Sequence, residues 1–258
     1  MHARWLAPWI LLAFLVGCGG GAKPPPKSDP QDAIDRLDTP GKIRVAQSFY
    51  QNGRAQEAVE VLEKAIEDDP TSAAVRNYQG QLLLLIGRYT EAEAALRAAL
   101  EIDPYMTDAH NNLGVVYDRM GDKVRAEQSF RTALADRTYP TPEKVHLNLG
   151  LLFESQGRRD EAIVELRRSV AINTTFYQGH YELAGLLEKE GALTEAAELY
   201  EVAAPLYRTS AEYHFRLGLT YFRLEDRIRA REHFNKVREL SPGSETAAQA
   251  AEYLGMMG

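Results

Sequence analysis

Small residues recur along this 258-residue chain with a period of about 34, which constrains the fold more than any other feature. Six alanines mark the period, at spacings of 34, 34, 36, 34 and 34: Ala58, Ala92, Ala126, Ala162, Ala196 and Ala230. A glycine stands five residues before each of the first five alanines, and Glu225 takes that place before the sixth. Such a period predicts a stack of similar units that bury their apolar faces on one another rather than in one central core.

The stretch 107–140 shows what one period contains. Two amphipathic segments are separated by Gly121, which can adopt the left-handed conformation that ends a helix. Gly114 and Ala126 are small where the two helices must cross closely, and Phe130 fills the seam beside them. These residues resemble the tetratricopeptide repeat (TPR), a pair of antiparallel helices in which Gly114 stands at position eight. The same pattern recurs in all six periods.

We therefore predict an all-α fold, a right-handed superhelical solenoid of six TPRs. The six repeats are expected at about 39–72, 73–106, 107–142, 143–176, 177–210 and 211–242. Residues 243–258 are predicted to form a capping helix that begins after Ser244 and shields the open end of the sixth repeat. The residues expected to cover that end are Ala247, Ala250, Ala251 and Leu254.

Residues 1–17 are predicted to be a signal peptide, because a basic start precedes an apolar run too short to span a bilayer. The run ends in Leu-Val-Gly-Cys at Cys18, which resembles the lipobox of bacterial lipoproteins and implies lipidation of that cysteine after cleavage. A plain signal peptide followed by a chance cysteine is the alternative. Gly19 follows instead of aspartate, and by the sorting rule of that family this implies the outer membrane, facing the periplasm. The Gly- and Pro-rich residues 18–39 are expected to form a flexible tether.

Composition and motifs favour a protein that binds other proteins. The formal net charge of −7 disfavours a nucleic-acid partner, which would need a basic surface. Four histidines share position four of their repeats: His110, His146, His180 and His214. Equivalent positions of neighbouring repeats are expected to lie ~20 Å apart, which is too far for two of these side chains to bind one metal ion. The sequence has no nucleophile elbow, Gly-rich phosphate loop or HExxH motif. We predict no catalysis, cofactor, metal or small-molecule substrate.

Asparagines form the first candidate partner-binding feature. Asn112 and Asn148 both stand at position six of their repeats, and Asn77 and Asn111 stand one place earlier. An asparagine amide offers both a donor and an acceptor, so a ladder of them can hydrogen-bond the backbone of an extended peptide. The alternative is that asparagine is simply tolerated on a polar face.

An apolar run in the second repeat forms the other candidate. Leu84 and Leu85 stand where the next three repeats carry mostly charged residues, so we expect them to face outward or into the groove, beside Ile43 and Tyr50 of the first repeat. A clustered apolar patch on a soluble face often marks a partner site. In the alternative, the tether folds back and covers the patch.

A lipobox, a short tether and six consecutive TPRs together resemble the type IV pilus pilotins, the PilF/PilW lipoproteins and the related Tgl motility protein. The resemblance implies a protein that binds a secretin subunit (PilQ-like) and promotes its delivery and assembly, with the contact in the groove of the N-terminal repeats. Two other readings stay open. One is an NlpI-like adaptor for peptidoglycan hydrolases or a periplasmic protease, and the other is a BamD-like accessory of outer-membrane assembly. Six near-regular repeats favour the pilotin.

Overall fold

A computed structural model describes residues 30–258, and every regular element among them is an α-helix. The predicted signal peptide and Cys18 lie outside the described residues, as does most of the tether. Residues up to Leu37 belong to a first unit, which contains α1 (Pro30–Asp35), and Asp38–Gly258 form a second unit. None of the described helices is long and apolar enough to cross a membrane.

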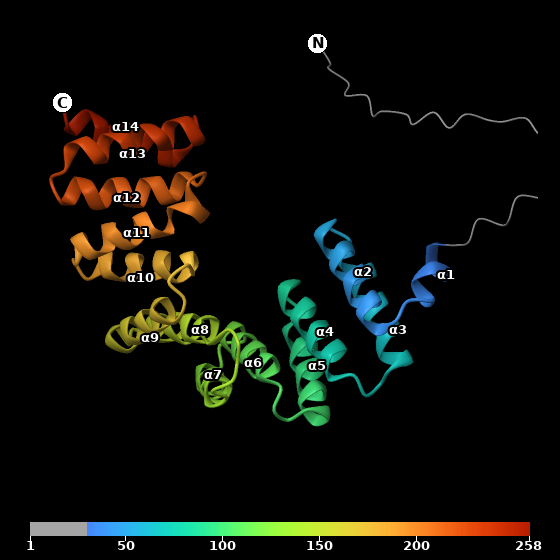
Figure 1. Ribbon diagram of the computed structural model, residues 1–258. Coiled ribbons are helices and arrows are strands. Elements are labelled where there is room, and N and C mark those ends of the chain that lie inside the picture. Colours follow the sequence, from blue (N-terminus) through green and yellow to red (C-terminus); the bar gives the residue numbers. More distant parts are fainter. Residues whose placement is uncertain (1–29) are drawn as a thin grey trace, which may run out of the picture. The chain divides into compact units, whose positions relative to one another are not determined.

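The second unit is a series of helix pairs followed by one last helix, and successive helices pack against one another in chain order (Figure 1). We call the first helix of each pair helix A and the second helix B. The pairs are α2 (Thr39–Gln51) with α3 (Ala55–Asp68), α4 (Ala73–Leu85) with α5 (Tyr89–Ile102), α6 (Thr107–Arg119) with α7 (Lys123–Ala135), α8 (Pro142–Ser155) with α9 (Arg159–Ile172), α10 (Tyr177–Lys189) with α11 (Leu193–Tyr207), and α12 (Ala211–Arg223) with α13 (Arg227–Leu240). The last helix is α14 (Glu245–Met256). The predicted all-α TPR solenoid is confirmed.

The turn inside each pair depends on one residue in the left-handed conformation. Five glycines adopt it, with φ between 74° and 86°: Gly53, Gly87, Gly121, Gly157 and Gly191. Glu225 occupies the same place in the sixth pair with φ of 62°, and it is the one non-glycine residue with positive φ among the described residues. Left-handed backbone is unfavourable for a residue with a Cβ, so the sixth turn is strained where the others are not.

Small residues let helices A and B of one pair cross closely. The six periodic alanines of the B helices are all fully buried. A Cβ added to Gly80 would lie 2.5 Å from Leu96 Cγ, and one added to Gly114 would overlap the Phe130 ring. Both Leu96 and Phe130 stand four residues after the periodic alanine of their B helix, so the same contact recurs from pair to pair. The expected reason for the small residues is confirmed.

Helix α14 closes the C-terminal end. Its N-cap is Ser244, whose hydroxyl accepts a hydrogen bond from the Ala247 amide at 3.1 Å. Ala247, Ala250 and Met257 are buried, but Ala251 is exposed, so its predicted covering role is wrong. The buried residues follow a spacing of three and seven along one helical stripe, and Ala251, one residue past Ala250, is rotated about 100° away from it.

Candidate partner-binding surface

The A helices bear equivalent residues in rows, because every pair repeats the same geometry. We call the surface that carries positions five, six, twelve and thirteen of the six A helices the A face. Neighbouring A helices approach one another directly between α2 and α4, α4 and α6, and α6 and α8. A side chain on this face can therefore reach its counterpart on the preceding A helix.

The four predicted asparagines form two hydrogen-bonded pairs on the A face. Asn112 Nδ2 donates to Asn77 Oδ1 at 3.0 Å, and Asn148 Nδ2 donates to Asn111 Oδ1 at 3.0 Å. In each pair, position six of one repeat bonds position five of the repeat before it. All four side chains are half-buried. The amides are thus partnered within the chain, yet Asn112 and Asn148 each keep a second N–H and a carbonyl oxygen for a further hydrogen bond.

The contact from position six to position five of the preceding repeat recurs near the C-terminal end, between side chains of a different kind. Arg216 at position six lies over the ring of Tyr181 at position five, with 5.3 Å from Cζ to the ring centroid. Its guanidinium also pairs with Glu188 at 3.3 Å. A Cβ added to Gly185 would lie 2.5 Å from Arg216 Nη2, so the absence of a side chain at that place leaves room for the arginine to cross α10 where it does.

The contact of Arg216 with Tyr181 and Gly185 was not expected from the sequence, although the sequence carried a signal for it. Gly185 stands at position nine, where the other repeats have valine, leucine or glutamine. A glycine inside a helix lowers stability by about 1 kcal/mol relative to alanine, so its presence there points to a packing reason. The reason is Arg216.

Glu182 stands at position six of the fifth repeat, between Asn148 and Arg216 in the row. Its side chain is half-buried, and no hydrogen bond or ion pair of the described residues engages its carboxylate. Burial raises the pKa of Glu182 above its ordinary value; Arg216 opposes this shift and the nearby Glu154 adds to it. The carboxylate therefore keeps unused acceptor capacity in a partly desolvated place.

The apolar candidates lie at the N-terminal end of the A face. Leu85 is 59% exposed, whereas Leu84, Ile43 and Tyr50 are half-buried. In later repeats a residue at position thirteen reaches position twelve of the repeat before it, as in the ion pair of Lys189 with Glu154 at 2.7 Å.

By analogy with this ion pair, we expect Leu85 at position thirteen to lie near Tyr50 at position twelve. Leu84 is more enclosed than we expected, because Leu84 faces the neighbouring helices while Leu85, one residue later at the end of α4, points away from them.

Position four makes a polar contact near the start of five of the six A helices. Three of its histidines hydrogen-bond backbone carbonyl oxygens just before or at the start of their own helix, each at 3.0 Å: His110 with Pro104, His180 with Phe176 and His214 with Arg208. His146 instead bonds Glu165 at 2.6 Å. Lys42 holds this place in the first repeat, where it is 1% exposed and ion-paired with Asp68. Between residues 30 and 258 no group of three or more potential metal ligands is found.

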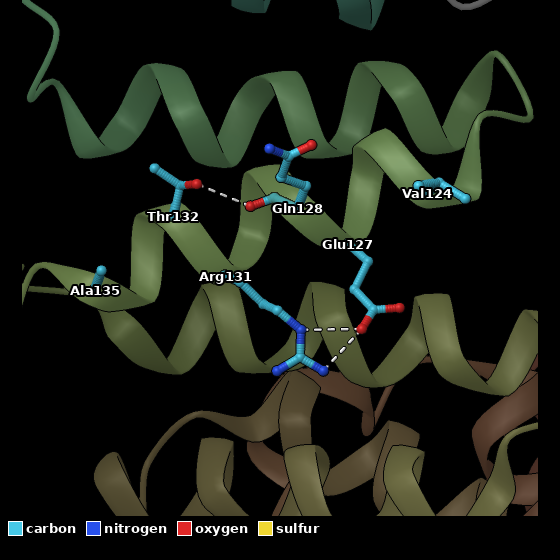
Figure 2. Close-up of a pocket in the computed structure, with 6 residues that line it drawn as sticks. All are labelled: Val124, Glu127, Gln128, Arg131, Thr132 and Ala135. Carbon is cyan, nitrogen blue, oxygen red and sulfur yellow. Dashed lines mark hydrogen bonds and ion pairs between the residues drawn. The ribbon is translucent and has the colours of Figure 1, made fainter.

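One hollow on the surface lies on helix B of the third pair, away from the A face. It measures about 570 Å³ and is lined by α7 alone, through Val124, Glu127, Gln128, Arg131, Thr132 and Ala135. Figure 2 shows that Arg131 turns back onto Glu127, with which it pairs at 2.7 Å, while Val124 projects apart from them. Its charged groups satisfy each other, so the hollow offers no converging set of free polar groups for a ligand.

Comparison with known proteins agrees with the repeat geometry. A tetratricopeptide-repeat model matches residues 45–107, 111–177 and 147–211, and two further models of the same repeat match 83–138 and 211–244. Comparison with curated protein sequences gives no match. TPR arrays in general present extended surfaces to protein partners.

Solved structures share the fold. PilW, described as a widely conserved type IV pilus biogenesis factor, is 24% identical with a TM-score of 0.73, over 83% of this chain and 98% of PilW. PilF of Pseudomonas aeruginosa is 24% identical with a TM-score of 0.72, over 87% of this chain and 99% of PilF. YrrB, a TPR protein with an unusual peptide-binding site, is 24% identical with a TM-score of 0.57, over 75% and 99%. The repeat matches cover more than half of the chain, which therefore belongs to the tetratricopeptide-repeat family.

Proposed function

We propose that the protein is an outer-membrane lipoprotein that acts as a pilotin: it binds a secretin subunit and promotes its localisation and multimer assembly for type IV pilus biogenesis. The observation that carries the proposal is the likeness to PilW, which extends over 83% of this chain and 98% of PilW. In this proposal the chain acts as a scaffold and catalyses no reaction.

The A face supplies the contact. Leu85, with Ile43, Tyr50 and Leu84 beside it, offers apolar surface to side chains of the secretin segment. The two asparagine pairs offer amide donors and acceptors to its backbone, independently of its side chains. The peptide-binding TPR protein YrrB is a precedent for this use of the fold.

The lipid at Cys18 would hold the bound secretin subunit at the membrane. Each buried CH₂ of an acyl chain contributes roughly 0.8 kcal/mol, so several chains on one cysteine give firm anchoring. Delivery then follows from two separate properties, a membrane anchor at the N-terminus and a binding surface in the repeats.

The test is complementation of a deletion strain of the bacterium that encodes the protein. Wild type should restore heat-resistant secretin multimers in the outer membrane, and with them pili. Cys18→Ser should incorporate no labelled palmitate and should leave the secretin outside the outer membrane. Normal secretin multimers in the deletion strain would refute the pilotin function, and altered peptidoglycan hydrolysis or outer-membrane protein assembly there would favour one of the two rival functions.

A further inference from the structure

We propose that the A face selects partner segments that carry a lysine or arginine side chain, and that Glu182 receives this cation. The inference rests on the proposed binding of an extended protein segment to the A face, and it adds the chemical class of that segment. Nothing in the pilus likeness points to Glu182; its place in the fold does.

Position six changes its chemistry along the A face. Asn112 and Asn148 present amides, Glu182 presents a carboxylate, and Arg216 presents a guanidinium that is already occupied. A segment lying along this row meets amide groups suited to its backbone and then one acidic group suited to a basic side chain. A backbone contact is indifferent to sequence, so among the position-six residues of repeats three to six Glu182 is the group that can discriminate by charge.

The Glu182 carboxylate has no ion-pair partner among the described residues, because the basic groups near it pair with other carboxylates. Arg216 is held by Glu188 at 3.3 Å and crosses α10 over Gly185. Lys189 is held by Glu154 at 2.7 Å. The Glu182 carboxylate is left half-buried, without a hydrogen bond or ion pair among the residues that the structure describes.

Partial burial makes this carboxylate a stronger partner for a cation than an exposed one. Its water shell is incomplete, which is the reason that its pKa is raised. An arriving ammonium or guanidinium interacts with it through a lower effective dielectric than at an open surface. Part of the desolvation of the carboxylate has already occurred on folding, so binding gains more of the attraction.

Aromatic rings stand beside the carboxylate. Tyr207, at the end of α11, stacks on Tyr181 with ring centroids 4.4 Å apart. Burial raises the pKa of the Tyr207 phenol, and the charge of the nearby Glu182 adds to the shift. Arg216 already lies over the ring of Tyr181. The ring of Tyr207 is half-buried, so part of its surface stays accessible to a bound side chain. The aliphatic stem of a lysine or the plane of an arginine can lie along such rings while the charge meets the carboxylate.

A library of random octapeptides displayed on phage tests the preference without any assumption about the secretin. Wild type should select peptides with a lysine or arginine at a fixed place, and replacing that residue by glutamine in a synthetic peptide should weaken binding about tenfold or more. Glu182→Gln should lose the preference and should melt no lower than wild type, because the raised pKa of Glu182 means that its charged form does not stabilise the fold. The matched control is Glu198→Gln, at an exposed glutamate of α11, which should keep the preference.

Charge reversal adds an independent arm: Glu182→Lys should bind the peptide whose basic residue is replaced by glutamate. The inference is overturned if the library yields no binders, if they show no basic preference, or if Glu182→Gln keeps that preference.

Peptides that tile the secretin of the same bacterium separate this inference from the proposed function. A basic preference in the library with no binding secretin peptide leaves the inference standing and removes the pilotin function. Secretin peptides that bind equally well after lysine and arginine are replaced by glutamine leave the function standing and remove the inference.

Discussion

Replacing Leu85 by lysine should separate binding from folding. Leu85 is 59% exposed, so it buries about two-fifths of its surface, and that share of the roughly 2 kcal/mol for a fully buried leucine is about 0.8 kcal/mol. Lysine recovers part of this loss, because Leu85 is the last residue of α4 and a cation at a helix C-terminus gains about 0.3–1 kcal/mol. The fifth repeat already carries Lys189 at the same position. We expect a net change within about 0.5 kcal/mol.

Thermal unfolding followed by helical circular dichroism measures that change. For a chain of this size 1 kcal/mol shifts the melting temperature by about 2–4 °C, so Leu85→Lys should melt within about 2 °C of wild type. Leu83→Ala, two residues earlier and 3% exposed, should lose about 2–5 kcal/mol and melt clearly lower. The pair distinguishes an exposed leucine from a buried one in the same helix.

The second readout is the heat-resistant secretin multimer in the complemented deletion strain. If Leu85 contacts the secretin, the stable Leu85→Lys protein should reach the membrane but leave the multimers depleted, because an apolar contact has been replaced by a solvated charge. Wild-type amounts of multimer would place the contact elsewhere on the chain. A large fall in melting temperature would instead mean that Leu85 packs into the core, contrary to its exposure.

Three further predictions concern packing, strain and charge. Gly114→Ala should destabilise the protein by about 1–3 kcal/mol, because the added methyl meets the buried Phe130 ring. Gly255→Ala, with open space around it inside α14, should stabilise the protein by about 0.5–1 kcal/mol, and urea unfolding compares the two variants. Glu225→Gly should raise the melting temperature, because it relieves a left-handed backbone whose penalty is about 1–2 kcal/mol, partly offset by the greater freedom of glycine in the unfolded chain. The raised pKa of Glu182 means that its carboxylate takes up a proton at a higher pH in the folded protein than in the unfolded chain. The free energy of unfolding should therefore rise as the pH falls from the folded-state pKa to the unfolded-state pKa, and it should level off below the latter. Urea unfolding at several pH values measures this rise, which Glu182→Gln should lack.

The helix pairs were predictable because their determinants are local. A left-handed turn residue such as Gly121 and a close crossing such as Gly114 on Phe130 are decided within one repeat, by backbone stereochemistry and by side-chain size. Repetition then multiplies the signal six times. In the sequence the sixth turn was visible as a break in the row of glycines. The structure shows why this turn is strained: Glu225 keeps the left-handed conformation that the glycines adopt in the other five turns.

The candidate site was less predictable because its contacts join different repeats. The sequence placed asparagines at positions five and six, but the bond between Asn112 and Asn77 depends on how one A helix stacks against the next. The exposure of Leu85 was expected, whereas Leu84 proved half-buried, because a run of apolar residues does not state which of two neighbours faces the helix seam. Arg216 acquired its role from Gly185, thirty-one residues earlier in the sequence.

The asparagine pairs lead to a prediction that the sequence alone would have missed. Seen as free amides, they could be replaced by alanine with hardly any loss of stability. The half-buried bond from Asn112 Nδ2 to Asn77 Oδ1 changes this expectation: Asn112→Ala should destabilise by about 0.5–1.5 kcal/mol, because it leaves the Asn77 carbonyl without its donor. Asn235→Ala, at an exposed position of α13, is the matched control and should be neutral.

A double-mutant cycle tests the bond itself. With Asn77→Ala already present, Asn112→Ala should cost less than it does alone, and the difference should be about 0.5–1 kcal/mol. Strictly additive losses in urea unfolding would mean that the two amides act independently. A binding assay on the two single variants is a separate test. Asn77→Ala and Asn112→Ala break the same internal hydrogen bond and differ in which amide remains. If Asn112→Ala weakens secretin binding more than Asn77→Ala does, the remaining N–H and carbonyl of Asn112 are assigned to the bound backbone.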